Sequence, residues 1–464
     1  MASNARQPDQ AIIEPIKSTE WSVERRPWTR PVLVVVLLLI AGLYLYGTVQ
    51  QAIYVNHGGT DQGAYTGYTR RLYDDITYID GNRMPLFPLV MRLFYTPEMS
   101  GGTLFELGKI VGIGLSVIAL VAVALVVHAY FPALLAASLT LITAFTVFVF
   151  KAPYYHPEIL FYTLYFFAFV LMCRGFQRLT PGLAAVIGFL LGLAMLAKAT
   201  ATAGLALFVV FKLAQIGYQA LKSRLEGRWR LALVSAASVG LVVMVFAAVL
   251  IPYMASSRRI FGPLFYNVNT TFYVWYDTWD EALEGTRAHG DRVGWPDMPA
   301  DELPSLGKYL AEHRPREILN RIVDGLEVSY RKHCTTDYEY QFGYCGYVAA
   351  FGIAAVVLVA ANARAVAARL RRHIFLVAFV IAFLAAHLLL SAWWVPISPG
   401  RRFLLSMFLP LMFSLGSVLA LPGLRRFAVR VAGRQTDAVT LFLIGVLIII
   451  SVDSILTATS DVLW

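Results

Sequence analysis

The feature that constrains this chain most is a series of long, nearly charge-free apolar runs. A membrane-spanning helix needs roughly 17–25 mostly apolar residues. Charged residues make up only 15% of the 464 residues, whereas a soluble domain has about 25%. The sequence therefore predicts an all-α polytopic membrane protein with about eleven transmembrane helices in a lipid bilayer. The predicted spans are 31–49, 107–130, 132–150, 157–173, 181–197, 199–216, 231–252, 346–363, 374–394, 403–421 and 438–456.

The net charge of +10 is explained by where the basic residues fall. Cytoplasmic loops carry an excess of Lys and Arg, and with eleven spans the main basic clusters all lie on one side. This predicts a cytoplasmic tail at 1–30, an outward tail at 457–464, and no nucleic-acid partner. The polar first 30 residues predict no cleavable signal peptide, so 31–49 would act as a signal anchor. The clusters are Arg25, Arg26 and Arg30; Arg174 and Arg178; Lys222, Arg224, Arg228 and Arg230; Arg364, Arg369, Arg371 and Arg372; Arg425, Arg426, Arg430 and Arg434.

The remaining chain reads as one membrane domain, 31–456, with two long outward loops at 50–106 and 253–345. Spacing of apolar residues predicts two amphipathic interfacial helices in the first loop and one helix in the second. The expected apolar faces are Tyr65, Tyr68, Leu72, Tyr73 and Ile76; Phe87, Val90, Met91 and Phe94; and Ile318, Leu319, Ile322, Val323 and Leu326.

Two cysteines, Cys334 and Cys345, fall on the outer side of the membrane, eleven residues apart. That compartment is oxidising, so a disulfide is expected there. It would stabilise the fold by roughly 3 kcal/mol, mainly through the unfolded chain. Two unrelated thiols are the alternative.

The stretch 57–65 follows the first apolar run and carries a carboxylate, Asp61, among several glycines. Two interpretations are open. Such a sequence favours a turn, and an aspartate caps a following helix. An acid that is partly buried at a membrane surface also suits a general base.

A second acid, Glu158, begins the apolar helix predicted after Pro157. The helix dipole alone stabilises an acid in this position. Alternatively, Glu158 is a second catalytic carboxylate, and with Asp61 it holds a divalent metal ion such as Mg or Mn through oxygen ligands, with His156 as a tentative third ligand.

Basic residues also occur where topology does not favour them. Lys198 interrupts an apolar run, at a cost of about 2.5–3.5 kcal/mol if it lies mid-membrane, so it either snorkels to the surface or binds an anion. Arg83, Arg401 and Arg402 lie on the outer side, where they anchor to headgroups or bind phosphate through their planar guanidinium groups.

Other patterns have simpler explanations. Gly112 and Gly114 lie inside an apolar span with no preceding strand, so they indicate helix packing rather than a dinucleotide loop. The sequon at Asn269 is a common chance match. His387 is expected to be a core histidine with satisfied hydrogen bonds.

Over roughly 50–420 the chain resembles the C-type membrane glycosyltransferases, in particular the bacterial relatives of protein O-mannosyltransferases and aminoarabinose transferases. The resemblance rests on the order and shared sidedness of 59–62, 83–88, 157–162, 188–198, 400–403 and 409–411. It implies a polyprenyl-phosphate sugar donor, inverting transfer on the periplasmic face of a bacterial inner membrane, and Asp61 as the catalytic base. It also implies that Lys198 and an arginine of the 400–403 segment bind the donor phosphate.

One departure leaves the acceptor open. Protein mannosyltransferases often carry Asp-Glu where this chain has Asp61-Gln62, so the acceptor is a cell-envelope glycan, a lipid or a protein. The physical argument agrees with the donor class, because phosphate is a good leaving group that needs only cations to stabilise its charge. A membrane transporter is the main alternative, since transporters also place ionisable residues within the bilayer.

Overall fold

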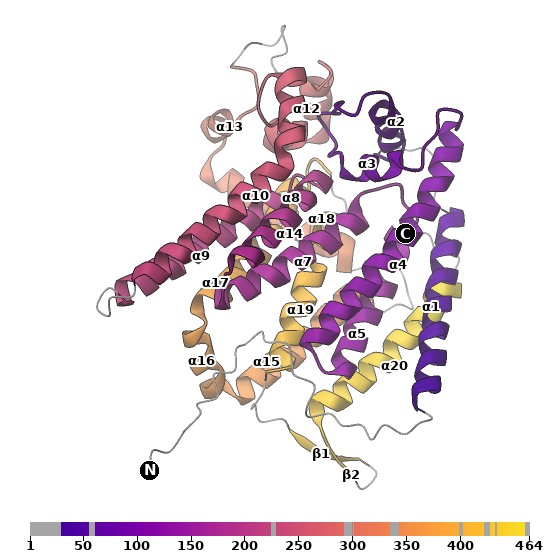
Figure 1. The fold of residues 1–464 in the computed structure, drawn as a ribbon, viewed down its shortest axis with the longest axis vertical. Helices are drawn as coiled ribbons and strands as arrows, with labels where there is room; N and C mark the ends of the chain where they lie inside the picture. The colour runs from indigo at the N-terminus through magenta and orange to yellow at the C-terminus, as the bar shows by residue number, and fades with distance from the viewer. Residues whose placement is uncertain are drawn as a thin grey trace.

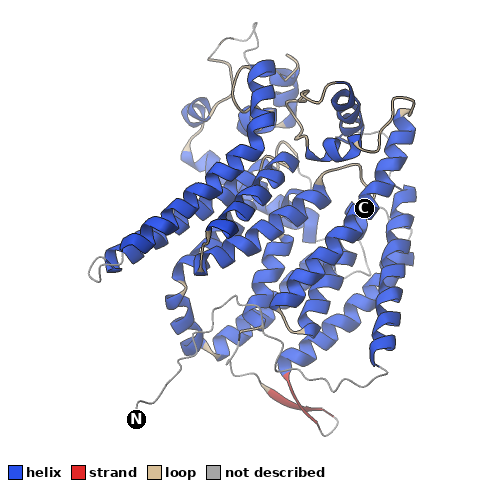
Figure 2. Ribbon diagram, in the orientation of Figure 1, coloured by secondary structure: helices blue, strands red, loops and turns tan. Residues whose placement is uncertain are grey.

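The computed structural model describes residues 29–54, 61–223, 229–291, 299, 301–334, 343–398, 402–421, 427–431 and 434–459. Within these ranges the chain is helical apart from its loops and one two-stranded hairpin (Figure 2). The predicted tail 1–30 therefore lies almost wholly outside the described residues. Of the predicted tail 457–464, the described part continues the last helix.

Nine helices in the described ranges are long and apolar enough to cross a membrane. They are α1 (Thr29–Tyr54), α4 (Gly101–Tyr130), the continuous run of α5 (Ala133–Thr143), η1 (Ala144–Phe148) and α6 (Val149–Lys151), α7 (Glu158–Gln177), α9 (Ala201–Ser223), α10 (Trp229–Phe261), α15 (Gly343–Ala361), α17 (Ile374–Trp394) and α20 (Ala438–Thr459). The predicted class, an all-α polytopic membrane protein, is thus confirmed.

The predicted number of eleven spans is not matched by eleven long helices. The remaining two predicted spans correspond to shorter apolar helices, α8 (Pro181–Ala197) and α19 (Phe408–Leu419). At 1.5 Å per residue, α8 is about 25 Å long, which is less than the roughly 30 Å of a hydrocarbon core. The short helix α18 (Arg402–Leu405) precedes α19, and a turn separates the two.

The short helices gather at one end of the bundle, and a different set of elements lies at the opposite end (Figure 1). The first group contains α2 (Asp61–Asp74), α3 (Leu86–Arg92), α11 (Val268–Thr271), η3 (Tyr273–Trp275), α12 (Trp279–Ala282), η4 (Leu283–Arg287) and α13 (Leu306–Glu312). The opposite end carries α16 (Ala363–Arg372) and the antiparallel strands β1 (Ala428–Val431) and β2 (Arg434–Asp437). The hairpin was not predicted; its arginines were assigned only to a basic cytoplasmic loop.

The two predicted helices of the first loop are α2 and α3, and each buries part of its apolar face within the protein. Tyr65, Tyr68 and Leu72 are buried in α2, whereas Tyr73 and Ile76 are exposed. In and near α3, Phe87 and Met91 are buried and Phe94 is exposed. The apolar spacing therefore located both helices.

The second loop is shorter than predicted, because α10 continues to Phe261 and α15 begins at Gly343. Its helix α14 (Pro315–Cys334) packs along α17. The helix predicted from the apolar residues between Ile318 and Leu326 is present; Leu319 and Val323 are exposed, and Gly325 faces α17. A Cβ on Gly325 would lie 2.1 Å from the Ala392 carbonyl oxygen, so only glycine allows this close approach.

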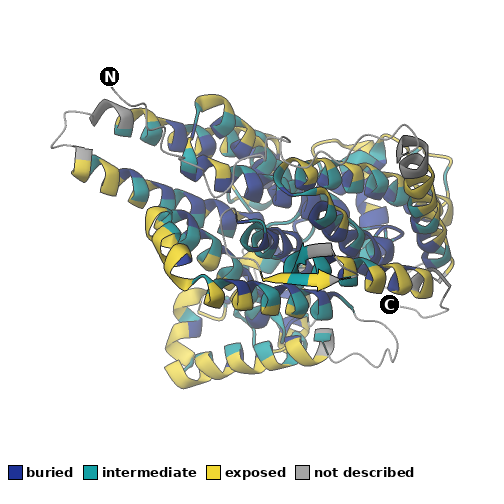
Figure 3. Ribbon diagram, turned by 90° about the horizontal axis from the view of Figure 1, so that it is seen from below, coloured by how far each residue is buried: buried dark blue, intermediate teal, exposed yellow. Residues whose placement is uncertain are grey.

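A disulfide joins Cys334, the last residue of α14, to Cys345 in the first turn of α15, with 5.4 Å between their Cα atoms. The helix α7 forms the centre of the bundle, and Tyr165, Phe166 and Phe169 within it have no exposed surface. Seen along the bundle, buried residues gather inside and exposed residues lie on the periphery (Figure 3). This rigid centre supports the end where the short helices gather.

Candidate functional site

A cavity of about 720 Å³ lies below the short helices, where several long helices begin or end. Its wall is formed by the start of α2, the turn before α3, the first turns of α7, the α8–α9 junction, α10, α11 and the last turns of α17. The acidic and basic residues in this wall are Asp61, Arg83, Glu158 and Lys198. Four residues that the sequence singled out separately therefore border one cavity.

The first charged group joins Asp61 to Arg83. Asp61 begins α2, where the helix dipole favours an acid. The Arg83 Nη2 atom lies 2.8 Å from Asp61 Oδ1, and its Nη1 atom lies 3.2 Å from Asp80 Oδ2. Burial alone would lower the pKa of Arg83, but the charges of Asp61 and Asp80 outweigh this and the pKa rises. Arg83 is thus a fixed cation shared by two carboxylates.

The turn that carries Arg83 is held by the second loop. Gly81 has a φ of +78°, a conformation that glycine adopts without strain. The Val268 amide donates a 2.8 Å hydrogen bond to the Gly81 carbonyl, and the Asn267 and Asn269 Nδ2 atoms both donate to the Asn82 carbonyl. Two loops far apart in the sequence therefore fix the position of one arginine.

The second charged group joins Glu158 to Lys198. Glu158 lies in the first turn of α7 with only 2% of its side chain exposed, and Lys198 caps the C-terminal end of α8. Their Oε1 and Nζ atoms are 2.9 Å apart. A helix start favours the acid and a helix end favours the cation. Because an isolated buried carboxylate is costly, Lys198 compensates a charge that would otherwise destabilise the fold.

The segment before α7 is fixed from two directions. On one side, α4 approaches so closely that a Cβ on Gly112 would lie 2.3 Å from the Ala152 carbonyl oxygen. On the other, the Tyr155 amide donates to Gln62 Oε1 at 2.9 Å. Gln62, the residue after the predicted base Asp61, is therefore hydrogen-bonded to the segment that leads into Glu158. These contacts couple the positions of the two acids.

A histidine also borders the cavity. The Nδ1 atom of His387 lies 2.7 Å from the Phe383 carbonyl, and its Nε2 atom lies 2.7 Å from the Tyr165 hydroxyl. Since a carbonyl can only accept, Nδ1 donates; in the neutral ring Nε2 then accepts from Tyr165. His387 is a buried residue with both ring nitrogens bonded, as expected from the sequence.

The remaining predicted site residues do not all lie in this wall. His156 packs against Tyr154 and Tyr65, and its Nδ1 atom is 3.5 Å from Glu158 Oε2, but it is outside the cavity lining. Arg401 lies outside the described residues, and of Arg402 only the backbone is described, at the start of α18. That an arginine of the 400–403 segment binds the donor phosphate stays a prediction.

The predicted metal site does not fit this arrangement. In the described part of the chain, no three residues among His, Cys, Asp and Glu are grouped to hold a metal ion. Asp61 is paired with Arg83, and Glu158 with Lys198, so each carboxylate already faces a cation. Asp61, Glu158 and His156 are therefore not grouped as a three-residue ligand set here.

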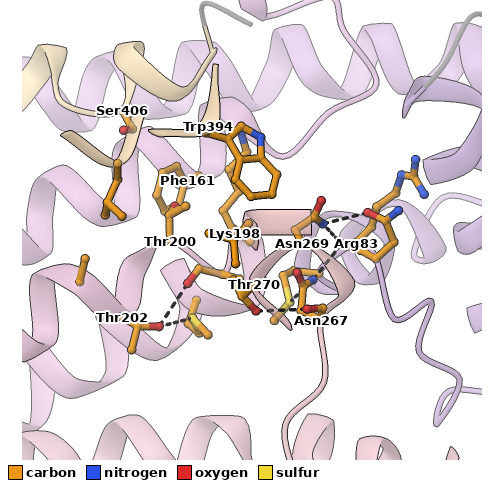
Figure 4. Close-up of a pocket in the computed structure, with 18 of the residues that line it drawn as sticks. Arg83, Phe161, Lys198, Thr200, Thr202, Asn267, Asn269, Thr270, Trp394 and Ser406 are labelled. Atoms are coloured by element: carbon orange, nitrogen blue, oxygen red, sulfur yellow. Dashed lines mark hydrogen bonds between the residues drawn. The ribbon is translucent and has the colours of Figure 1, made fainter. Parts of the chain in front are cut away.

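Several wall residues were missed by the sequence interpretation. The wall asparagines Asn82, Asn267 and Asn269 were not singled out as functional, and neither was Trp275. Asp80, which lies behind the wall as a partner of Arg83, was also missed. Figure 4 shows Lys198 between Phe161 and Thr200 on one side and the asparagines beside Arg83 on the other. The aromatic residues concentrated at the start of the second loop were the one sequence feature that pointed to this part of the wall. They suggested contact with lipid headgroups instead.

No protein-family model matches this chain, and no curated protein is found to be similar to it. The class of protein that the fold defines is an all-α polytopic membrane protein. Its activity is a matter for proposal from the cavity.

Proposed function

We propose that this chain is an inverting glycosyltransferase that moves a sugar from a polyprenyl-phosphate donor to a hydroxyl acceptor on the periplasmic face of a bacterial inner membrane. The observation that carries the proposal is the shared cavity, which joins two acid–cation pairs to an apolar wall. The acceptor is a cell-envelope glycan, a lipid or a protein. The family resemblance noted above supports the same donor class.

The cations suit a lipid phosphate. Lys198 and Arg83 both border the cavity with about one sixth of their side chains exposed, 15% and 17% respectively. A donor phosphate between them would exchange part of its hydration for charge-assisted hydrogen bonds. These become stronger as negative charge develops on the leaving phosphate. A predicted arginine of the 400–403 segment would add to this set.

The apolar part of the wall suits a prenyl chain. Met195 of α8, Phe246 and Leu250 of α10, and Leu390 of α17 line the cavity together with the charged groups. Of these residues, Leu390 has 45% of its surface exposed. The cavity wall thus has charged groups on one part and apolar residues on another. A ligand with a charged head and a long apolar tail matches such a wall better than a small polar solute does.

Asp61 is the proposed base. The acceptor oxygen forms a bond to the anomeric carbon of the sugar, its proton passes to the Asp61 carboxylate, and the bond from that carbon to the phosphate oxygen breaks. The electron pair stays with the polyprenyl phosphate, so no general acid is required. One displacement inverts the anomeric configuration. Arg83 orients Asp61, and this positioning supplies much of the rate.

No step in this scheme uses a metal ion, because the acids are paired with cations rather than grouped as ligands. Glu158 has a supporting role: its charge holds Lys198 at the cavity wall. This assigns different work to the two acids, since Asp61 is 26% exposed and Glu158 only 2%. The more accessible acid is the one that an acceptor hydroxyl can reach.

The deciding experiment is transfer of a labelled sugar by the purified full chain in nanodiscs. Undecaprenyl phosphate carrying mannose, glucose or arabinose would serve as donors, with membrane lipid, glycan and peptide acceptors. Net transfer that is lost in Asp61→Asn supports the proposal. Uptake of a solute into proteoliposomes without sugar transfer from any donor would instead identify a transporter.

A further inference from the structure

A group of three asparagines forms one side of the cavity. Asn267 and Asn269, at the beginning of α11, both donate through Nδ2 to the Asn82 carbonyl, at 2.8 and 2.9 Å. Asn269 Nδ2 also donates to Asn82 Oδ1 at 2.9 Å. All three residues line the cavity. The two amide groups of α11 therefore have their nitrogen atoms committed to the turn that carries Arg83.

These bonds fix which way each amide points. A side-chain amide can be turned over, but the Asn82 carbonyl only accepts hydrogen bonds, so Nδ2 and not Oδ1 must face it. For Asn267 and Asn269 the Oδ1 atoms are therefore directed away from the Asn82 carbonyl. The orientation follows from the hydrogen bonds themselves.

The Asn267 oxygen has an unusual environment. The residue is 2% exposed, and no donor within the described residues bonds to its Oδ1 atom. A buried carbonyl oxygen without a donor costs about 1–3 kcal/mol. Most buried polar groups in proteins have a partner. In a residue that borders a cavity, the missing donor is expected to come from a ligand.

We propose that Asn267, assisted by Asn269, binds a hydroxyl group of the ring that occupies this side of the cavity. The chemistry excludes the donor phosphate from this position, because phosphate oxygens and an amide oxygen are both acceptors and repel each other. A hydroxyl donates, so it satisfies Oδ1. The inference rests on the proposed function, since it assigns these asparagines to sugar recognition beside the charged groups.

The aromatic residues next to the asparagines support a ring ligand. Trp275, Trp393 and Trp394 also line the cavity, and Figure 4 shows Trp394 above Lys198. A sugar ring has an apolar C–H face that packs on an aromatic ring, while its hydroxyl groups bond at its edge. A site that bonds a substrate hydroxyl strongly rejects the analogue that lacks it, because its own polar group is then left unpaired. Asn267 would thus determine sugar specificity.

The first measurement is binding to the full chain in nanodiscs without any acceptor. The probes are undecaprenyl phosphate alone and undecaprenyl phosphate carrying the preferred sugar or each of its monodeoxy analogues. For wild type, one deoxy position should weaken binding by roughly five- to thirtyfold. In Asn267→Ala, that same position should lose its effect, while the other deoxy positions keep theirs.

Several outcomes overturn the inference. If Asn267→Ala weakens all donors by the same factor, the asparagine only supports the Arg83 turn. If deoxygenation matters only to a sugar-containing acceptor, and that effect is lost in the variant, the ring bound here belongs to the acceptor and not the donor. Asn269→Ala, at a more exposed position, is the second variant if Asn267→Ala does not fold.

Undecaprenyl phosphate alone separates this inference from the proposed function. Binding of this probe that depends on Lys198, with no sugar discrimination at Asn267, contradicts the asparagine role and leaves the transferase proposal intact. Failure to bind the probe at all contradicts the transferase proposal itself. A control variant, Asn362→Ala, changes an asparagine at the opposite end of the bundle and should behave as wild type.

Discussion

The Arg83 guanidinium lies 2.8 Å from the Asp61 carboxylate, and this contact joins two segments of the first loop at the cavity wall. Arg83 also bonds Asp80, so one cation holds two acids. Asp61 is the more accessible of the two acids in the cavity wall, and it is held in position beside a fixed positive charge. A general base needs access to the proton that it removes and a fixed position.

Replacement of the proposed base gives the most direct prediction. Asp61→Asn should reduce sugar transfer by roughly 10²–10⁴-fold, the usual contribution of a general base. Binding of undecaprenyl phosphate should change little, because Lys198 is untouched. Turnover and donor binding measured on the same preparation check this. Transfer at the wild-type rate would contradict the base assignment.

Asp80 is a positioning residue that should affect turnover through Arg83. Asp80→Asn keeps an acceptor oxygen but removes the charge from Arg83, so we expect turnover to fall by roughly three- to tenfold with donor affinity little changed. The matched control is Asp75→Asn in the same loop, where the carboxylate is exposed and bonds Thr77. An equal effect of the two substitutions would exclude a specific role for Asp80.

Lys198 must be tested together with its buried partner. Lys198→Gln alone would leave the Glu158 charge uncompensated, at a cost of about 3–5 kcal/mol. The double variant Lys198→Gln, Glu158→Gln retains a neutral hydrogen-bonded pair and should fold. It should bind undecaprenyl phosphate roughly ten- to a hundredfold more weakly, as measured by titration in nanodiscs.

The control for Lys198 is another buried lysine. Lys212 is 5% exposed, lies in the second half of α9 and bonds Gln215 at 2.7 Å, and it is not in the cavity wall. Lys212→Gln should leave binding of undecaprenyl phosphate unchanged. Similar losses in both variants would mean that general destabilisation, and not a phosphate contact, accounts for the effect.

The sequence was sufficient for the fold class and for part of the candidate site, for physical reasons. Apolar runs long enough to span a bilayer can be counted directly, because lipid leaves the backbone few alternatives. Charged residues that interrupt such runs, such as Lys198, are conspicuous for the same reason. Asp61, Arg83 and Glu158 were found from their place at turns and helix starts on one side of the predicted bundle.

Other features depended on contacts that spacing does not reveal. Asn269 begins a sequon that resembles a chance match, and Asn267 lies two residues before it. Their bonds to Asn82 cross more than 180 residues of chain. The close backbone contact of α14 with α17 at Gly325 is likewise one that apolar periodicity cannot anticipate. Such features arise from the three-dimensional approach of segments rather than from local pattern.

Two glycines of α4 provide a test of close packing within one helix. A Cβ at Gly112 would lie 2.3 Å from the Ala152 carbonyl oxygen, whereas Gly114 has nothing within 4 Å of the corresponding position. Gly112→Ala should therefore destabilise the protein by about 1–3 kcal/mol and reduce transfer by displacing the segment before Glu158. Gly114→Ala should be neutral or slightly stabilising. Thermal unfolding in detergent and sugar transfer would distinguish them.

The contact between α13 and the cavity wall, which runs through His313 and Asp277, should weaken as pH rises. His313 Nε2 is 2.6 Å from Asp277 Oδ2, and its Nδ1 is 2.9 Å from the Tyr309 carbonyl. Both partners accept hydrogen bonds, so only the doubly protonated ring satisfies both. Burial alone would lower the pKa of His313, but these bonds outweigh it and raise the pKa above its usual value near 6.5.

A raised pKa in the folded state means that the stabilising effect is complete below about pH 6.5 and is lost as pH rises through the folded value. Asp277 also bonds Arg321, whose guanidinium carbon lies 4.3 Å from the centre of the Trp393 ring, in the cavity wall. Hydrogen exchange of the α13 amides, corrected for the intrinsic pH effect, should therefore show protection that decreases from pH 6 to pH 9. His313→Gln should remove this pH dependence, and a persistent decrease in that variant would assign it to another group.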